Sequence, residues 1–353
     1  MKTRVILALS AIALIVAGCC KDKAPPESKI GIDNPENNPA VVAAAKEVMA
    51  CDWEKAGFGA KCEALQAWRK NDVVKKGADS TLVNFLEDPD IKVQWLGAEA
   101  LSRGGDTYMK DAALSAKIFD AMEKAAEPFL MDQLKTSAAK VDLNTTGLGA
   151  RAMTMLETHE NIAVRRAIAG SSILFHNRSY PGLFDLNMKL ARSDIDSKVR
   201  IGAAGAFWIG TPQGKKEEVC KLWFNLANDA DGDVAGPSAY HCAFWSNDGG
   251  CAGQWEGLLS LIEQKAKAGT VAHMMMASSP GYVYGQKKAS DAIKKRALAV
   301  AKAIVQNKAN SDSARSNNLS FIAKHDPAGK AFVKPYENDS SQLVRSTAKE
   351  FNK

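Results

Sequence analysis

The chain has 353 residues, of which 46% are hydrophobic and 7% aromatic, and its formal net charge at pH 7 is +6. A chain of this length and composition can bury a sizeable core, which excludes the class of intrinsically disordered proteins. Basic residues are scattered and mostly balanced by acidic neighbours, so we expect no nucleic-acid partner. Abundant alanine and few aromatic residues favour packed helices.

Residues 1–18 have the three parts of a secretory signal peptide. Lys2 and Arg4 give a short positive start, residues 5–17 are almost entirely apolar, and small residues close the segment. This pattern is typical of exported proteins. The apolar run is shorter than the roughly 20 residues that a membrane-spanning helix needs. An uncleaved membrane anchor is the alternative.

The segment Val16-Ala17-Gly18-Cys19 resembles the lipobox of bacterial lipoproteins. The resemblance implies that the thiol of Cys19 receives a lipid and that Cys19 becomes the first residue of the mature protein. Cleavage one residue later, before Cys20, is also conceivable. The resemblance further implies a membrane contact through this lipid and an extracytoplasmic position in the cell envelope. The outer membrane is favoured if the cell has two membranes.

Residues 19–42 are expected to be the lipidated cysteine and a flexible tether. The segment is polar, contains several prolines and asparagines, and shows no apolar periodicity, so it cannot bury enough surface to offset the entropy of ordering. Residues 43–80 predict an N-terminal helical cap. Cys51 and Cys62 flank a glycine-containing turn there, and we expect them to form a disulfide.

Three further cysteines follow in the second half of the chain. A short stretch with a strong turn signal separates Cys242 from Cys251, which favours a disulfide between these two. Cys220 and Cys242 are an equally good pair, because they lie symmetrically about Asp231 in an expected helical hairpin. Connectivity does not follow from sequence alone, and the Cys242–Cys251 pair is slightly preferred.

A repeat runs through the remainder of the chain. Five valines each stand three residues after a polar residue of the kind that caps helices, and the four intervals between them are 71, 35, 35 and 110 residues. A period of about 35 therefore predicts one degenerate unit within residues 111–150 and three units after residue 234. The valines are Val93, Val164, Val199, Val234 and Val344.

Each unit is predicted to be a helix, a tight turn and a second helix. The capping residue begins the second helix, because its side chain accepts hydrogen bonds from the first free backbone N–H groups. Small residues at 202–206 would allow another helix to approach closely. A unit of this kind cannot bury its own apolar face, so neighbours must stack. We therefore predict an all-α protein in which residues 81–353 form an α-solenoid.

This pattern resembles HEAT-like repeats over about residues 80–353. The resemblance implies a ladder of aspartate and arginine side chains between successive repeats, with a structural role. The matching positions are Asp196 with Arg200, Asn161 with Arg165, Asp231 without an arginine, and Arg345 without an aspartate.

No motif for catalysis, nucleotide binding or metal binding is present. None of the five histidines lies four residues from another, and no recognisable zinc spacing occurs. Met274, Met275 and Met276 suggest a Cu(I) site, but consecutive helical side chains point about 100° apart and cannot converge on one ion. We expect no enzyme activity, no metal and no cofactor.

Residues 278–285 are expected to form a loop that interrupts the repeat and is the best candidate for a functional insertion. Trp208, Trp245, Tyr282 and Tyr284 form a possible binding surface, since large aromatic rings make good anchors. The sequence thus favours a membrane-anchored scaffold that binds another envelope protein. The alternatives are a protein that binds a small ligand or Cu(I), and an accessory subunit of an envelope enzyme that uses the 270–290 loop.

Overall fold

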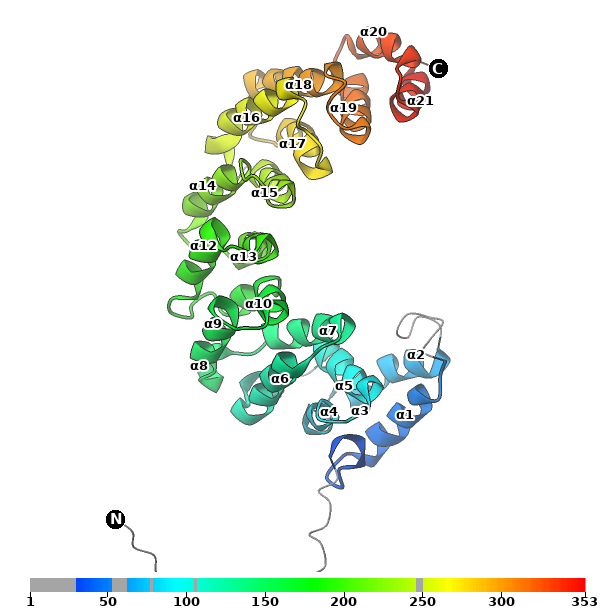
Figure 1. Cartoon of the computed structure of the whole chain (residues 1–353), viewed down its shortest axis with the longest axis vertical. Helices are drawn as coiled ribbons and strands as arrows, with labels where there is room; N and C mark the ends of the chain where they lie inside the picture. Colours follow the sequence, from blue (N-terminus) through cyan, green and yellow to red (C-terminus); the bar gives the residue numbers. More distant parts are fainter. Residues whose placement is uncertain (1–29, 53–61, 77–78, 105–106, 246–249, 353) are drawn as a thin grey trace, which may run out of the picture.

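The computed structural model describes residues 30–52, 62–76, 79–104, 107–245 and 250–352. These residues are helical, without a strand among them, and the helices stack into an open arc (Figure 1). The all-α solenoid prediction is confirmed. The signal peptide, Cys19 and Cys20 lie outside the described residues. The α-helices, in chain order, are α1 (Pro39–Met49), α2 (Glu63–Lys70), α3 (Asp72–Lys75), α4 (Asp79–Phe85), α5 (Ile91–Arg103), α6 (Ala112–Lys124), α7 (Pro128–Ala139), α8 (Leu143–Thr146), α9 (Gly149–Glu157), α10 (Ile162–Ala169), α11 (Ile173–His176), α12 (Leu183–Ser193), α13 (Ser197–Gly210), α14 (Lys216–Leu226), α15 (Gly232–Phe244), α16 (Trp255–Ala268), α17 (Met274–Gly285), α18 (Asp291–Gln306), α19 (Asp312–His325), α20 (Gly329–Val333) and α21 (Gln342–Phe351).

The folded body begins earlier than the predicted tether allows, because the segment before α1 packs against the first helix pair. The backbone N–H of Ile32 donates to the Asp88 carboxylate at 2.7 Å. The Asn37 side chain is buried, and its amide donates to the Gly31 carbonyl at 2.7 Å. Asn38 then caps α1. The assignment of residues 30–42 to a flexible tether is therefore wrong, since their polar side chains hold the chain in place.

Helices α1 to α3 form the N-terminal cap and pack on α5. Cys51 and Cys62 form a disulfide, as predicted. The cap is held to the first repeat by Glu99, whose carboxylate is almost fully buried and accepts from Arg69 and Arg103, both at 2.8 Å, and from the Trp68 indole at 3.3 Å. Solenoids need such a cap because their first repeat lacks a neighbour.

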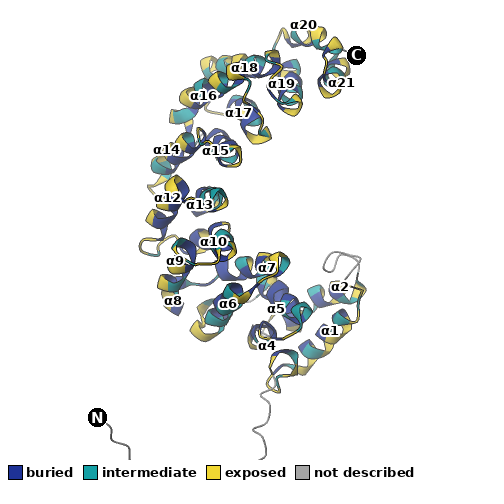
Figure 2. Ribbon diagram, viewed as in Figure 1, coloured by how far each residue is buried: buried dark blue, intermediate teal, exposed yellow. Residues whose placement is uncertain are grey.

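Beyond the cap the helices alternate between two layers. The outer layer of the arc holds α4, α6, α9, α12, α14, α16 and α18, and the inner layer holds α5, α7, α10, α13, α15, α17 and α19 (Figure 1). Figure 2 shows that the buried residues lie between the layers along the whole arc. The N-caps of the inner helices and α21 stand at 90, 127, 161, 196, 231, 273, 311 and 341, at intervals of 30 to 42 residues. The degenerate unit predicted within residues 111–150 is formed by α6 and α7.

Close approach between inner helices depends on small residues, as predicted. A Cβ on Gly202 of α13 would lie 2.7 Å from the backbone carbon of Ala169 at the end of α10. Val199, Ala203 and Phe207 of the same helix are buried in the core. Spacings of four residues keep these three side chains on one side of α13 and leave Gly202 free to meet the preceding repeat.

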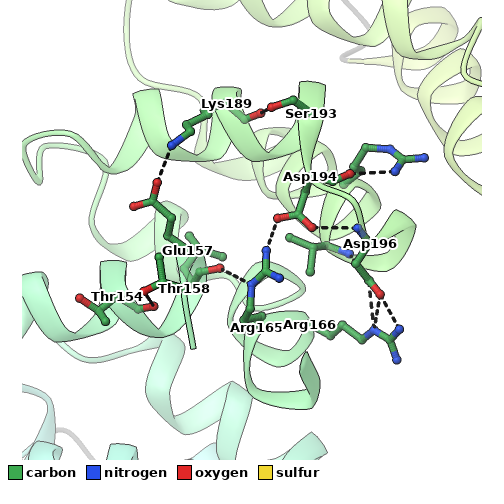
Figure 3. A network of polar contacts seen from close by, with 12 residues as sticks. Thr154, Glu157, Thr158, Arg165, Arg166, Lys189, Ser193, Asp194 and Asp196 are labelled. Atoms are coloured by element: carbon green, nitrogen blue, oxygen red, sulfur yellow. Dashed lines mark hydrogen bonds and ion pairs between the residues drawn. The ribbon is translucent and has the colours of Figure 1, made fainter. Parts of the chain in front are cut away.

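The aspartate–arginine ladder exists, but its aspartate is not the predicted one. Asp194 stands two residues before the N-cap, accepts the backbone N–H of Asp196 at 2.9 Å, and pairs with Arg165 of the preceding repeat (Figure 3). Asp229 likewise accepts from Asp231 at 2.8 Å and pairs with Arg200 at 3.0 Å. In Asp194 one carboxylate oxygen accepts from the turn and the other from Arg165. In Asp229 both oxygens accept from Arg200, and Oδ1 also accepts from the turn.

The predicted capping residues of the ladder and Arg345 make other contacts. Asn161 and Asp231 cap their own helices, and Asp196 does so while also accepting from Arg166 at 2.5 Å. The guanidinium of Arg345 donates to backbone carbonyls of the preceding turn, at 2.6 and 2.8 Å. Asp196 thus both caps α13 and pairs with the preceding repeat, whereas Arg165 and Arg200 meet Asp194 and Asp229 in place of the capping residues.

The expected loop at residues 278–285 is wrong, because α17 runs through it as an ordinary inner helix. The Ser278 and Ser279 hydroxyls donate to the carbonyls of Met274 and Met275 at 2.8 and 2.9 Å, and Pro280 is buried inside the helix. A Ser-Ser-Pro-Gly segment is typical of turns, but contacts of α17 with both α15 and α19 override that preference.

The second disulfide joins Cys220 to Cys251, with Cα atoms 5.4 Å apart, so the preferred Cys242–Cys251 pair is wrong. Cys242 has a free thiol and is buried in α15. It lies eight residues after Val234, which places both side chains on the core side of the helix. Burial raises the pKa of the Cys242 thiol to about 12. Residues 246–249, which contain most of the expected turn, lie outside the described residues.

Candidate functional site

A row of partly exposed aromatic rings crosses the inner helices α13, α15 and α17. We call Trp208, Tyr240, Phe244 and Tyr282 the aromatic strip. Trp208 and Tyr240 are stacked with ring centroids 5.8 Å apart. Tyr282 then meets Tyr240 edge-on at 5.0 Å and lies 4.9 Å from Phe244. Three successive repeats therefore contribute to one continuous surface.

The strip faces away from the core because of helix geometry. In α15 the core side is marked by Val234, Ser238 and Cys242, all buried. Tyr240 lies six residues after Val234, about 240° around the helix, and Phe244 follows one turn later on the same side. These two rings therefore lie on a different side of α15 from its buried residues, and α15 belongs to the inner layer of the arc (Figure 1).

Exposed apolar side chains occur both in the strip and elsewhere on the helices that carry it. Tyr282 is 37% exposed, Ile209 of α13 is 46% exposed, and Met274 and Met275 at the start of α17 are 40% and 43% exposed. Single exposed hydrophobic residues are ordinary on protein surfaces, but a contiguous group of them marks an interaction surface. Of the three adjacent methionines, only Met276 is buried in the core.

The strip rests on a rigid apolar base. His241 packs between Trp208 and Trp223, with ring centroids 4.9 and 5.1 Å away. Its Nδ1 atom is buried without a hydrogen-bond partner. Burial lowers the pKa of His241 to about 4, so the imidazole is neutral at physiological pH. Ring stacking thus fixes Trp208 without introducing a charge beneath the surface.

Of the four aromatic residues named from the sequence, only Trp208 and Tyr282 belong to the strip. The Trp245 indole donates to the Trp208 carbonyl at 3.0 Å and joins neighbouring repeats. Tyr284 belongs to a separate cluster around α19. Sequence reasoning missed Tyr240, although its spacing of four residues from Phe244 could have indicated a shared face.

A cleft of about 430 Å³, lined by both apolar and charged side chains, lies on α7, α10 and α13, towards the N-terminal part of the inner layer. Its charged residues have both signs: Glu127 and Asp132 face Lys135, Arg166 and Lys198. Arg166 is already held by Asp196. The inner helices therefore carry this cleft with charges of both signs as well as the aromatic strip, and protein-binding surfaces usually combine apolar and polar parts.

Within the described ranges, no group of three or more His, Cys, Asp or Glu side chains is arranged to hold a metal ion. No helix in that part of the chain is long and apolar enough to cross a membrane. Comparison of the sequence with protein-family models gave no match. Comparison with curated proteins gave none either.

Proposed function

We propose that the chain is a bacterial lipoprotein whose HEAT-like solenoid binds another envelope protein along its inner face. The proposal assigns no catalysis to the chain. The observation that carries it is the aromatic strip, where Trp208, Tyr240, Phe244 and Tyr282 present a continuous partly exposed surface across three repeats.

The shape and chemistry of this surface favour a protein over a small molecule. Small-molecule sites are concave and enclose most of the ligand, whereas the strip runs in the open along three helices. Tyrosine and tryptophan supply large contact areas at low conformational cost and dominate binding energy at protein interfaces. The charged residues of the cleft on α7, α10 and α13 would supply a hydrated part of the interface.

The envelope location rests on the N-terminal sequence. The signal-like segment and Cys19 imply export and a lipid anchor. The two disulfides, Cys51–Cys62 and Cys220–Cys251, support an oxidising compartment, since such bonds are rare in the cytosol.

Photocrosslinking in native envelopes tests the proposal. A photoreactive residue replaces Tyr282, which is exposed on the inner layer, or Lys221 on outer helix α14, whose side chain is 60% exposed. The proposal expects one protein to be captured from position 282 and not from position 221. Capture should weaken when Cys19→Ala releases the chain from the membrane.

A point variant then tests the strip itself. Tyr282→Ser removes one exposed ring without opening the core, and we expect at least a tenfold loss of affinity for the captured protein. Lys221→Ser is the matched control and should bind normally. If Tyr282→Ser binds as tightly as the control, or if position 221 captures the same protein equally well, the inner face is not the binding surface.

A further inference from the structure

Charge is unevenly distributed along the solenoid, which the modest net charge of the whole chain conceals. Residues 261–353 contain 16 Lys and Arg but only 7 Asp and Glu, a net charge of +9. Residues 1–260 contain 30 basic and 33 acidic residues, a net charge of −3. The C-terminal repeats are therefore strongly basic, and such asymmetry indicates an anionic partner.

A cleft of about 490 Å³ opens beside α18, at the ends of α17 and α19. Three lysines of α18 line it, together with Tyr284 and His325. Two carboxylates belong to the lining as well. The charged lining residues are Lys294, Lys295, Lys302, Asp291 and Asp326. Residues 295 and 302 are two helical turns apart on the same side of α18, which brings their ammonium groups to the cleft. The ring of Tyr284 packs 5.0 Å from His325 and forms an apolar part of the lining.

Two of the four basic residues of α18 have no ion-pair partner within the described part of the chain. Arg296 turns away from the cleft to Glu263 at 2.5 Å, and Lys302 pairs with Asp326 at 2.5 Å. Lys294 and Lys295 have no acidic partner within the described part of the chain. A bound anion would give these two ammonium groups a counter-charge.

We propose that this cleft is a binding site for phosphate groups, carried by a lipid headgroup or by a free phosphorylated molecule. Clustered lysines suit phosphate because each ammonium acts as a point charge towards its several oxygens, whereas carboxylates are best recognised by the planar fork of arginine. Lys287 and Lys288, both exposed just before the α18 N-cap, would extend the same positive surface.

Titration of the full chain with sodium pyrophosphate, followed by calorimetry, tests the site. The double variant Lys294→Gln/Lys295→Gln removes the two unpaired charges. We expect about thirtyfold weaker binding, from roughly 1 kcal/mol for each lysine near an anionic surface. The matched control Lys46→Gln/Lys70→Gln removes two exposed charges from the N-terminal cap and should bind like the unmodified chain. Thermal unfolding of each variant confirms that it is folded.

Vesicles distinguish the two phosphate sources. Stronger sedimentation with phosphatidylcholine vesicles containing phosphatidylglycerol than with phosphatidylcholine alone, lost in Lys294→Gln/Lys295→Gln, identifies a headgroup site. Pyrophosphate binding without this difference identifies a free phosphorylated ligand. The proposal is overturned if neither probe binds, if the control variant loses as much affinity, or if polyglutamate competes as well as pyrophosphate. Tyr282→Ser should leave phosphate binding unchanged, so failure here is separable from failure of the protein-binding proposal.

Discussion

Arg315 connects the last two repeats through a deeply buried ion pair. Its side chain is 1% exposed, and its guanidinium donates to Asp339 at 3.1 and 2.5 Å and to the Val305 carbonyl at 3.1 Å. Asp339 also accepts the backbone N–H of Ser341 at 2.9 Å. Arg315→Met keeps the length of the side chain but leaves the Asp339 carboxylate buried without its counter-charge.

The expected cost follows from that burial. Breaking a buried ion pair by removing one partner lowers the free energy of unfolding by about 3–5 kcal/mol. Burial alone would raise the pKa of Asp339, and hydrogen bonds from Arg315 and Ser341 hold it below its usual value. In the unmodified chain this stabilisation is present above the unfolded pKa and is lost as pH falls through the lowered folded pKa. In Arg315→Met the pKa of Asp339 should instead rise. Lowering the pH should therefore reduce the difference in free energy of unfolding between the variant and the unmodified chain.

Hydrogen exchange is the suitable assay, because repeats of a solenoid can open separately. We expect amides of α19 and α21 to exchange roughly two to four orders of magnitude faster in Arg315→Met, while amides of α12 and α13 keep their rates. Lys189→Gln breaks an inter-repeat pair that is largely exposed on the lysine side (Lys189 64%, Glu157 35%) and should change stability by no more than about 0.5 kcal/mol. Equal effects of the two variants would refute the argument.

Three further predictions concern the cysteines, His241 and Asp196. In the double variant Cys220→Ala/Cys251→Ala, the free energy of unfolding measured with urea should fall by about 2–4 kcal/mol. The thiol of Cys242 should react with thiol reagents only after denaturation, because burial raises its pKa to about 12. In a ring NMR titration His241 should stay neutral down to about pH 4. Its contribution to stability is then complete above the unfolded pKa near 6.5 and lost as pH falls through about 4; a midpoint near 6.5 in the folded protein would contradict its burial. Arg166→Gln should raise the pKa of Asp196 towards 3.8, because the Arg166 hydrogen bond is the main cause of its lowering, and carboxyl NMR measures the shift.

The repeat was predictable because its signals are local. A capping side chain accepts from a backbone N–H only two or three residues away, so Asp196 bonds to Val199 and Asp231 to Asp233 whatever the rest of the chain does. The unit α6–α7 was located only as a gap in the spacing, because Glu127 at its N-cap position makes no side-chain capping bond.

The candidate site was predictable only in part. Trp208 and Tyr282 could be named as binding candidates from residue type, but residue type could not separate them from Trp245, whose indole serves the fold. The lysines of the α18 cleft are unremarkable in sequence. They became a candidate site only because the fold brings Tyr284 of α17 and His325 of α19 to the same cleft.

The sequence by itself determined the all-α class, the period, the positions of most inner helices and the Cys51–Cys62 disulfide, because each depends on residues close together in the chain. The tertiary structure decided which acid meets Arg165, which cysteine meets Cys251, and that α17 is a helix despite its Ser-Ser-Pro-Gly segment. These depend on which faces meet when repeats stack. A shift of one residue moves a side chain by about 100° around its helix, so partners about 30 residues apart are set by packing between helices and not by spacing in the sequence.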